Sequence, residues 1–248
     1  MTKSILITGA GRGIGRATAI MAGRRGWSVG VNFAGNGKAA AETVAAVIAA
    51  GGRAVAIKGD VAVEADVLAM FDVTIAAFGG LDGVVNNAGI VGPPQQLADM
   101  SMSRLRRMFE TNILGAYLVA REAARRLSAK RGGRGGVIVN ISSAAARLGS
   151  PNEYVDYAGS KGAVDTMTIG LSKELGPEGI RVNCVRPGII DTEIHASGNQ
   201  PDRAARIGPV TPLGRAGTAD EVAEAIVWLL SDAASYVNGA QLDVTAGR

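Results

Sequence analysis

The sequence has very few of the residues that cross-link proteins or bind metal ions. Its 248 residues include one cysteine and one histidine. A single cysteine excludes an internal disulfide framework and a cysteine-rich zinc site. A single histidine excludes a multi-histidine metal site and weakens the case for a serine–histidine–aspartate triad. We therefore expect no metal ion in this protein.

The sequence also has few aromatic residues and only a small excess of positive charge. Aromatic residues make up 4% of the chain, and the formal net charge is only +4. The densest basic stretch, residues 125–134, ends a helical pattern, where cations suit the helix dipole. We favour a solvated helix end over a nucleic-acid patch, because no aromatic residue that could stack on bases lies within the stretch. We expect no nucleic acid among the partners.

Long apolar runs are missing too. No segment approaches the ~20 apolar residues that a membrane-spanning helix needs. Only three apolar residues in a row precede Thr8, which is too few for the core of a signal peptide. The sequence therefore predicts a cytoplasmic protein without a membrane partner.

Glycine and apolar residues, in contrast, are abundant. The chain has 35 glycines and is 47% hydrophobic, which excludes a disordered or collagen-like protein. Short apolar runs alternate with longer helical patterns that end at glycine, so we expect a parallel sheet covered by helices on both faces. The expected strands are residues 5–7, 28–33, 54–58, 83–86, 137–141, 181–185 and 241–244, and the expected helices are residues 14–25, 39–50, 64–78, 103–127, 157–175 and 219–230.

A glycine-rich turn joins the first expected strand to the first helix. It reads Thr-Gly-Ala-Gly-Arg-Gly-Ile-Gly over residues 8–15. Glycines let a backbone approach a ligand closely, and the amides at the start of a helix suit a pyrophosphate. The spacing departs from the Gly-x-Gly-x-x-Gly dinucleotide fingerprint, so a plain tight connection stays open as the alternative.

Four more motifs follow that turn in order. They are Asn-Asn-Ala-Gly at residues 86–89, the pair Ser142-Ser143, Tyr157-x-x-x-Lys161 and Pro187-Gly188. Together the five motifs resemble the short-chain dehydrogenase/reductase family over nearly the whole chain. The resemblance implies a doubly wound Rossmann fold with a seven-stranded parallel sheet, formed by residues 1–248 as a single domain. It also implies a nicotinamide cofactor and chemistry on a carbonyl/alcohol pair.

Tyr157 and Lys161 are spaced so that both project from one face of a helix. A nearby ammonium stabilises a phenolate and lowers the pKa of the phenol, which suits proton transfer. The resemblance makes Ser143 the group that holds the substrate oxygen and Asn112 the holder of a proton-relay water. Ser143 lies fourteen residues before Tyr157, against thirteen in many relatives, and Ser142 is the weaker choice.

The cofactor itself is expected to be NADP(H), with NAD(H) as the alternative. No carboxylate follows the second strand after Asn32 to repel a 2′-phosphate, and Arg12 could supply a countercharge. Asp60, which the resemblance places at the adenine, could equally be a helix N-cap. The expected cofactor-binding residues are Gly9, Arg12, Gly13, Ile14, Gly15, Asn32, Asp60, Val61, Asn87, Ala88, Gly89, Tyr157, Lys161, Pro187, Gly188, Ile190 and Thr192.

The longest segment without clear periodicity, residues 188–217, reads as a lid or binding loop. By resemblance, a lid over about residues 189–211 closes on the substrate, with His195 as a solvated loop residue. Tyr154 has no lysine four residues later, and Cys184 reads as inert core. The substrate stays open among a 3-oxoacyl thioester, a sugar or polyol and a small ketone. The alternative function is a catalytically silent nucleotide sensor or scaffold, and the resemblance implies a homotetramer.

Overall fold

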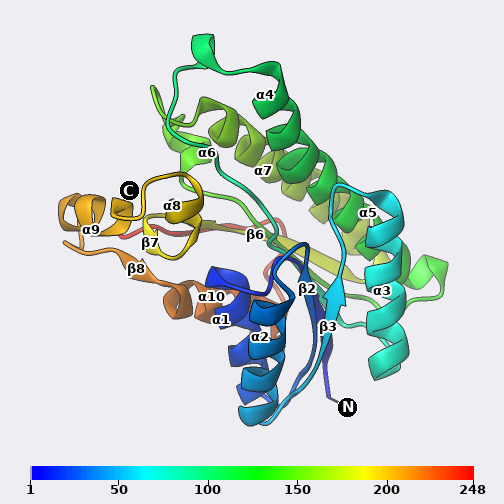
Figure 1. The fold of residues 1–248 in the computed structure, drawn as a ribbon. Coiled ribbons are helices and arrows are strands. Elements are labelled where there is room, and N and C mark those ends of the chain that lie inside the picture. The colour runs from blue at the N-terminus through cyan, green and yellow to red at the C-terminus, as the bar shows by residue number, and fades with distance from the viewer. Residues whose placement is uncertain (1) are drawn as a thin grey trace.

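A computed structural model describes residues 2–248 and shows a seven-stranded parallel sheet flanked by helices (Figure 1). The strand order is β3-β2-β1-β4-β5-β6-β9, and every pairing is parallel. These strands are β1 (Ser4–Ile7), β2 (Ser28–Phe33), β3 (Arg53–Lys58), β4 (Gly83–Asn86), β5 (Gly136–Ile141), β6 (Ile180–Pro187) and β9 (Gln241–Val244). The predicted fold class and all seven predicted strands are confirmed.

Both faces of the sheet are buried, as the uninterrupted apolar runs predict. One hydrophobic cluster joins the sheet to α1, α2 and α10, and a second joins it to α3, α5 and α7. The two groups of helices lie on opposite sides of the sheet (Figure 1). The longer helices are α1 (Gly13–Arg24), α2 (Gly37–Ala49), α3 (Glu64–Phe78), α4 (Met102–Phe109), α5 (Ala116–Leu127), α7 (Val155–Leu175) and α10 (Ala219–Leu230).

The strand order reverses between β1 and β4, which lie side by side although β2 and β3 separate them in sequence. Thr8, directly after β1, accepts hydrogen bonds through its hydroxyl from the amides of Asn87 and Ala88, which follow β4. In open parallel sheets, ligands bind beyond the carboxyl ends of the strands at such a reversal. The fold therefore places the glycine turn and the Asn-Asn-Ala-Gly motif together at the expected crevice.

The long helix predicted over 103–127 is interrupted. A π-helical turn, η2 (Glu110–Gly115), separates α4 from α5. Within this turn, the Asn112 side chain bonds the backbone of Ile90, accepting from its amide at 2.8 Å and donating to its carbonyl at 2.9 Å. Hydrophobic periodicity does not register one extra residue in a turn, so the sequence predicted a continuous helix.

The aperiodic segment contains several short elements. They are β7 (Ile190–Asp191), α8 (Ile194–Ser197), α9 (Arg203–Ile207), η5 (Gly208–Val210) and β8 (Gly217–Thr218), with β7 and β8 paired in parallel. The C-terminus lies beside α8 and α9 (Figure 1). The remaining short helices are η1 (Leu97–Asp99), η3 (Ala129–Arg131), α6 (Ala145–Leu148), η4 (Gly176–Glu178) and η6 (Asp232–Ala234).

Within residues 2–248, no helix combines the length and apolar character needed to cross a lipid bilayer.

The basic stretch at the end of α5 forms ion pairs with acidic neighbours. Arg126 forms ion pairs with Glu122 at 2.6 Å and with Asp72 at 2.7 Å.

Candidate active site

The glycine turn has no room for side chains at two of its positions. Gly9 adopts a φ of +63°, and a Cβ there would lie 3.0 Å from the Ala88 Cα. A Cβ on Gly15 would lie 2.6 Å from both the Gly9 carbonyl oxygen and the side-chain nitrogen of Asn87. The turn therefore packs directly against the segment after β4, which brings the start of α1 to the crevice.

A groove of about 660 Å³ runs along this turn. No side chain caps the amino-terminal amides of α1, whose N-cap is Arg12. Free amides at a helix start suit a phosphate group, so the turn fits a dinucleotide. The groove is lined, among others, by Gly9, Arg12, Gly13, Ile14, Gly15, Asn32, Asp60, Val61, Asn87, Ala88, Gly89 and Thr192, all expected from the sequence.

At the far end of the groove, the Asn32 side chain is committed to the protein. Its carbonyl oxygen accepts from the Gly9 amide at 3.1 Å, and its nitrogen donates to the carbonyls of Ile57 and Gly59. Asn32 thus orients the glycine turn, and its side chain is almost fully buried. The exposed Arg12 and Arg16 line the groove here.

Asp60 does not cap a helix, because the N-cap of α3 is Val63. Its carboxylate accepts from the Ala62 amide at 3.0 Å, and its own amide donates to Asp66. Asp60 is exposed on the groove wall. The N-cap alternative for this residue is therefore wrong.

A second pocket, of about 170 Å³, holds the predicted catalytic side chains. Ser143, after β5, and Tyr157 and Lys161, on α7, all line it. The pocket continues into the groove, because both are lined by Ile14 and Thr192. Pro187, Gly188 and Ile190 form part of its wall, as expected.

The Lys161 ammonium is held inside the protein. Its Nζ donates to the Ile141 carbonyl at 2.8 Å and lies 5.7 Å from the centre of the Tyr157 ring. Burial lowers the pKa of Lys161 to about 8, against the opposing influence of Cys184 and Asp165. Lysine is therefore turned toward Tyr157 and away from bulk water.

The pKa of Tyr157 departs from the expected direction. Burial of the phenol raises its pKa above 10, and the Ser143 hydroxyl bonded to it lowers the pKa only in part. Burial raises this pKa because it removes water from the charged phenolate, which the neutral phenol does not need. Tyr157 keeps its proton at neutral pH, which suits a proton donor.

The two serines after β5 differ in what they contact. Ser142 is 2% exposed and donates to the Lys161 carbonyl at 3.1 Å. Ser143 is half-buried; its oxygen accepts from the nearby Ala145 amide, and its hydroxyl is bonded to the Tyr157 phenol. Ser143 is therefore the more exposed of the two serines and the one in contact with Tyr157.

Asn112 lies behind the pocket instead of in its wall. Besides its bonds to Ile90, its side-chain nitrogen donates to the Ser160 hydroxyl at 3.2 Å. Gly89 separates it narrowly from Lys161, since a Cβ at Gly89 would lie 3.3 Å from Asn112 Oδ1 and 3.4 Å from Lys161 Nζ. The Asn112 side-chain nitrogen is thus engaged within the protein, and its oxygen already accepts one hydrogen bond.

Comparison with known proteins agrees with this geometry. Residues 9–248 match the family model described as "Enoyl-(Acyl carrier protein) reductase". The uncharacterized oxidoreductase YgfF of Escherichia coli (strain K12) is 50% identical over 243 residues, which cover 98% of each chain. The chain belongs to the short-chain dehydrogenase/reductase family.

Two further members of the family match almost the full length. L-rhamnose 1-dehydrogenase (NAD(P)(+)) of a Sphingomonas strain is 40% identical and covers 99% of this chain and 95% of its own. The 3-ketoacyl-(acyl-carrier-protein) reductase of Brucella melitensis, solved with NADH, superposes with a TM-score of 0.91 at 31% identity over 99% and 98% of the two chains. This dehydrogenase/reductase thus has a nicotinamide-binding fold and acts on a CH–OH/C=O pair.

Sequence reasoning missed one group of residues in this short-chain dehydrogenase/reductase. Arg203, on α9, bonds both oxygens of Glu153, at 3.1 and 2.7 Å, and stacks 5.0 Å from the Tyr154 ring centre. Arg203 and Tyr154 both line the catalytic pocket. Arg203 and Glu153 are fifty residues apart in the sequence, so only the folded structure reveals their contact.

His195 was expected in solvent, and that expectation is wrong. It is half-buried on α8, lines the pocket, and shares a 2.9 Å hydrogen bond with the Ile190 carbonyl through Nε2. Burial lowers the pKa of His195 below its ordinary value. Cys184, in contrast, is fully buried as expected, and burial raises the pKa of its thiol to about 12.

Proposed function

We propose that this protein is an NADP(H)-preferring oxidoreductase that interconverts a carbonyl and a secondary alcohol on a compact substrate. One observation carries the proposal: the pocket with Ser143, Tyr157 and Lys161 opens into the glycine-lined groove. A nicotinamide ring at that junction lies beside the phenol. A catalytically silent scaffold has no need of this intact set of side chains.

The cofactor fits the chain's own groups. The amides at the start of α1 and the glycines of the turn hold the diphosphate. Asp60 and Val61 receive the adenine, and Asn87, Ala88 and Gly89 run along the middle of the dinucleotide. The backbone of Ile190 and the Thr192 hydroxyl hold the carboxamide, beside the wall of Pro187 and Gly188.

In carbonyl reduction, the protonated Tyr157 donates its proton to the substrate oxygen while Ser143 holds that oxygen in place. The bound nicotinamide supplies the hydride, and takes it back in alcohol oxidation. Lys161 bonds the nicotinamide ribose and stabilises the charge that forms on Tyr157. The backbone at Asn112 holds the water that returns a proton toward Lys161.

NADP(H) is preferred because no carboxylate directly follows β2; the one glutamate of α2 that lines the groove, Glu42, is set against two arginines. Asn32 is turned inward, and the exposed Arg12 and Arg16 line the groove nearby. Cations at that point attract a 2′-phosphate. Steady-state kinetics test this: kcat/KM for NADPH should exceed that for NADH by about tenfold or more, since one charge-assisted contact is worth roughly 1.5–3 kcal/mol. A preference for NADH contradicts the assignment.

The substrate pocket favours a compact molecule with more than one polar group. The volume of about 170 Å³ suits a single ring, and Val91, Leu148 and Ile189 give it an apolar side. Tyr154, His195 and Arg203 give it a polar side. The lid, about residues 189–211, closes over this space. Small ketones and sugars or polyols therefore rank ahead of long 3-oxoacyl thioesters.

NADPH consumption across an aldose, a small diketone and a 3-oxoester tests the activity directly. The wild type should consume NADPH with at least one of them, and Tyr157→Phe should lose most of that turnover while keeping its affinity for NADPH. Binding of NADPH without turnover on any carbonyl compound favours the silent scaffold. Unchanged turnover in Tyr157→Phe disproves the role of the phenol.

We also propose a cytoplasmic homotetramer. The outer side of α4, η2 and α5 exposes an apolar surface formed by Met102, Leu105, Phe109, Ile113, Leu114 and Tyr117. Such a surface is typical of an interface between subunits. The matching surfaces by family resemblance are this helix pair, α7 and the tail at residues 241–248.

A further inference from the structure

A buried ion pair lies directly beside the catalytic tyrosine. Asp156 is the residue before Tyr157, and its side chain is 0% exposed. Arg104, on α4, reaches it with two parallel hydrogen bonds, from Nε to Oδ2 at 2.8 Å and from Nη2 to Oδ1 at 3.2 Å. The arginine side chain is itself only 13% exposed. Two-pronged contacts of this kind fix direction as well as distance.

The remaining nitrogen of Arg104 ties in a third segment. Nη1 donates to the Pro93 carbonyl at 2.6 Å and to Gln95 Oε1 at 3.1 Å. The backbone N–H of Gln95 in turn donates to the backbone carbonyl of Glu153 at 3.0 Å. Arg104 thus joins α4, the segment after β4 and the start of α7, and four of its five N–H groups are used within the protein.

The start of α7 needs such support. Tyr157 is the third residue of α7, and the N-cap of that helix, Tyr154, makes no side-chain cap. An uncapped first turn leaves amides without partners and frays readily. Fraying there would carry the phenol away from Ser143. A carboxylate in the first turn also suits the helix dipole.

Stability alone does not account for this pair. Burying two charges has a large desolvation cost, and apolar residues of the same size often stabilise a protein equally well. Neither side chain lines the catalytic pocket among the described residues, so neither touches substrate. What a two-pronged ion pair provides, and an apolar contact does not, is a fixed orientation of the helix start.

We propose that Arg104 and Asp156 are positioning residues that hold the first turn of α7, and with it the Tyr157 hydroxyl, in register with Ser143. The inference rests on the proposed function for its kinetic readout. A displacement of the reacting group by about 1 Å can lower a rate about 100-fold. The pair acts on turnover and should leave the binding of the cofactor unchanged, because neither residue lines the glycine-rich groove.

Three variants and a control test the proposal: Arg104→Met, Asp156→Asn, the double variant, and Arg107→Met on the exposed side of α4. Turnover is measured with NADPH and whichever of the aldose, diketone or 3-oxoester the wild type consumes fastest. We expect kcat to fall about 10- to 100-fold in each single variant. NADPH affinity and KM should stay within about twofold, and the control should match the wild type. Arg104→Lys, which keeps the charge, should recover part of kcat.

The double variant separates positioning from general damage. Because both residues act through one contact, it should lose no more than the worse single variant. Losses that multiply, a kcat within about twofold of wild type in either single variant, or a parallel loss of NADPH affinity overturn the proposal.

Hydrogen exchange gives a readout that needs no turnover. The amides of residues 158–160 close the first turn of α7, so their exchange should be at least about tenfold faster in Arg104→Met and Asp156→Asn than in wild type, with distant core strands unchanged. Unchanged exchange there contradicts the proposal. A wild type that shows no turnover on any carbonyl compound refutes the proposed function, while this measurement still decides the role of the pair.

Discussion

At the scale of single residues, the catalytic pocket depends on charges kept away from water. Lys161 is 5% exposed, and burial lowers its pKa from the ordinary 10.5 to about 8. A lowered folded-state pKa means that the folded protein binds this proton less tightly than the unfolded chain. The charged form therefore opposes folding below about pH 8, and this opposition fades as the pH rises to about 10.5.

Lys161→Met should accordingly stabilise the protein while it abolishes turnover. Removing the buried charge should raise the free energy of unfolding at pH 7 by about 1–3 kcal/mol, after the loss of the bond to Ile141. Urea unfolding at pH 7 and pH 10 checks this, with Lys173→Met on the exposed end of α7 as control. The gain should shrink at pH 10, and a destabilised variant at pH 7 contradicts the assignment.

Tyr157 leads to a prediction about direction and pH. Because burial raises the pKa of its phenol, the proton stays on at neutral pH. Carbonyl reduction, which consumes that proton, should keep its pH 7 rate up to about pH 10, which lies below the raised pKa. Alcohol oxidation, which needs the phenolate, should speed up over the same range. Initial rates in both directions between pH 6 and about pH 10 test this, and parallel profiles disagree with it.

The chemistry-bearing residues could be found from the sequence because they follow strands or share one helix face. Their surroundings could not. The spacing of Tyr157 and Lys161 predicted a lowered phenol pKa, whereas burial of the phenol raises that pKa in the structure. Arg104 and Asp156 are fifty-two residues apart, and no local pattern predicts that they meet.

At the scale of elements, an ion pair joins two segments of the pocket wall that are far apart in sequence. Arg203 on α9 bonds Glu153, which precedes α7. The Arg203 guanidinium lowers the pKa of the Glu153 carboxyl. The pair therefore persists at neutral pH and is lost only as the pH falls through that lowered value.

Glu153→Gln should loosen the lid without touching the reacting groups. We expect KM for the substrate to rise about 3- to 10-fold and kcat to change less than about twofold, since the tether holds the closed state and not the phenol. Glu224→Gln, which removes an exposed ion pair with Arg25, is the control. A loss confined to kcat is inconsistent with a tether.

Most helices and strands were predicted from the sequence, but the π-turn and the short elements near the pocket were not. Apolar runs and terminal glycines located every strand of the seven-stranded sheet but not the short β7 and β8, because buried parallel strands and capped helices leave strong local signals. The π-turn at Glu110–Gly115 leaves none, because it depends on the Asn112 side chain bonding Ile90, far away in the chain. The short helices α8 and α9 likewise form against the pocket and have no strong periodicity of their own.

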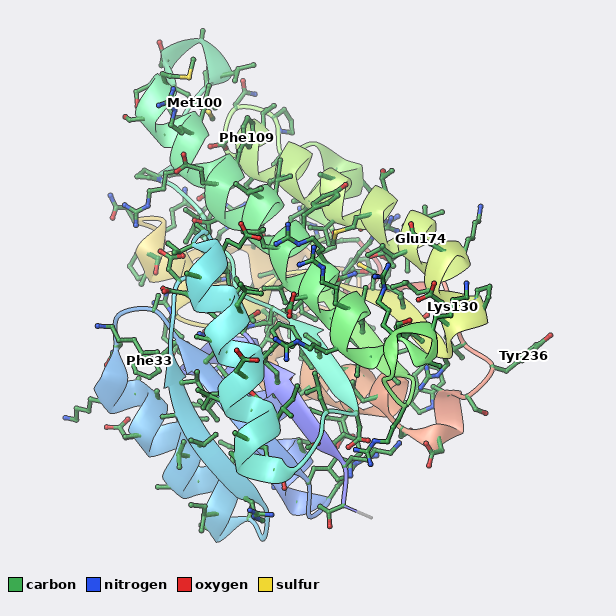
Figure 2. The ribbon with its side chains drawn as sticks, turned by 90° about the vertical axis from the view of Figure 1, so that its right-hand side faces the viewer. Phe33, Met100, Phe109, Lys130, Glu174 and Tyr236 are labelled. Atoms are coloured by element: carbon green, nitrogen blue, oxygen red, sulfur yellow. The ribbon has the colours of Figure 1, made fainter. Side chains whose placement is uncertain are left out.

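At the scale of the whole molecule, the sheet is covered on both faces but one outer surface stays apolar. Phe109, labelled on α4 in Figure 2, is 42% exposed, and Leu114 nearby is 51% exposed. Tyr236, in contrast, projects alone at the opposite end of the view (Figure 2). A clustered apolar surface suits a partner subunit, whereas an isolated exposed side chain needs none.

Leu114→Arg should therefore dissociate the proposed tetramer. A charge in an apolar interface is costly to desolvate, so sedimentation should show a smaller species. Tyr236→Arg, at a more exposed position outside the apolar surface, should leave the assembly intact. A Leu114→Arg variant that sediments like the wild type shows that this surface is not the interface.

The burial of Cys184 makes the molecule well suited to spectroscopy. With its pKa at about 12 and no exposure, this thiol should ignore maleimide reagents in the native state. Val210, 76% exposed at the end of the lid, can then be replaced by cysteine and carry a single fluorophore. Stopped-flow traces from that dye would follow closure in real time, with no need to engineer away a background label.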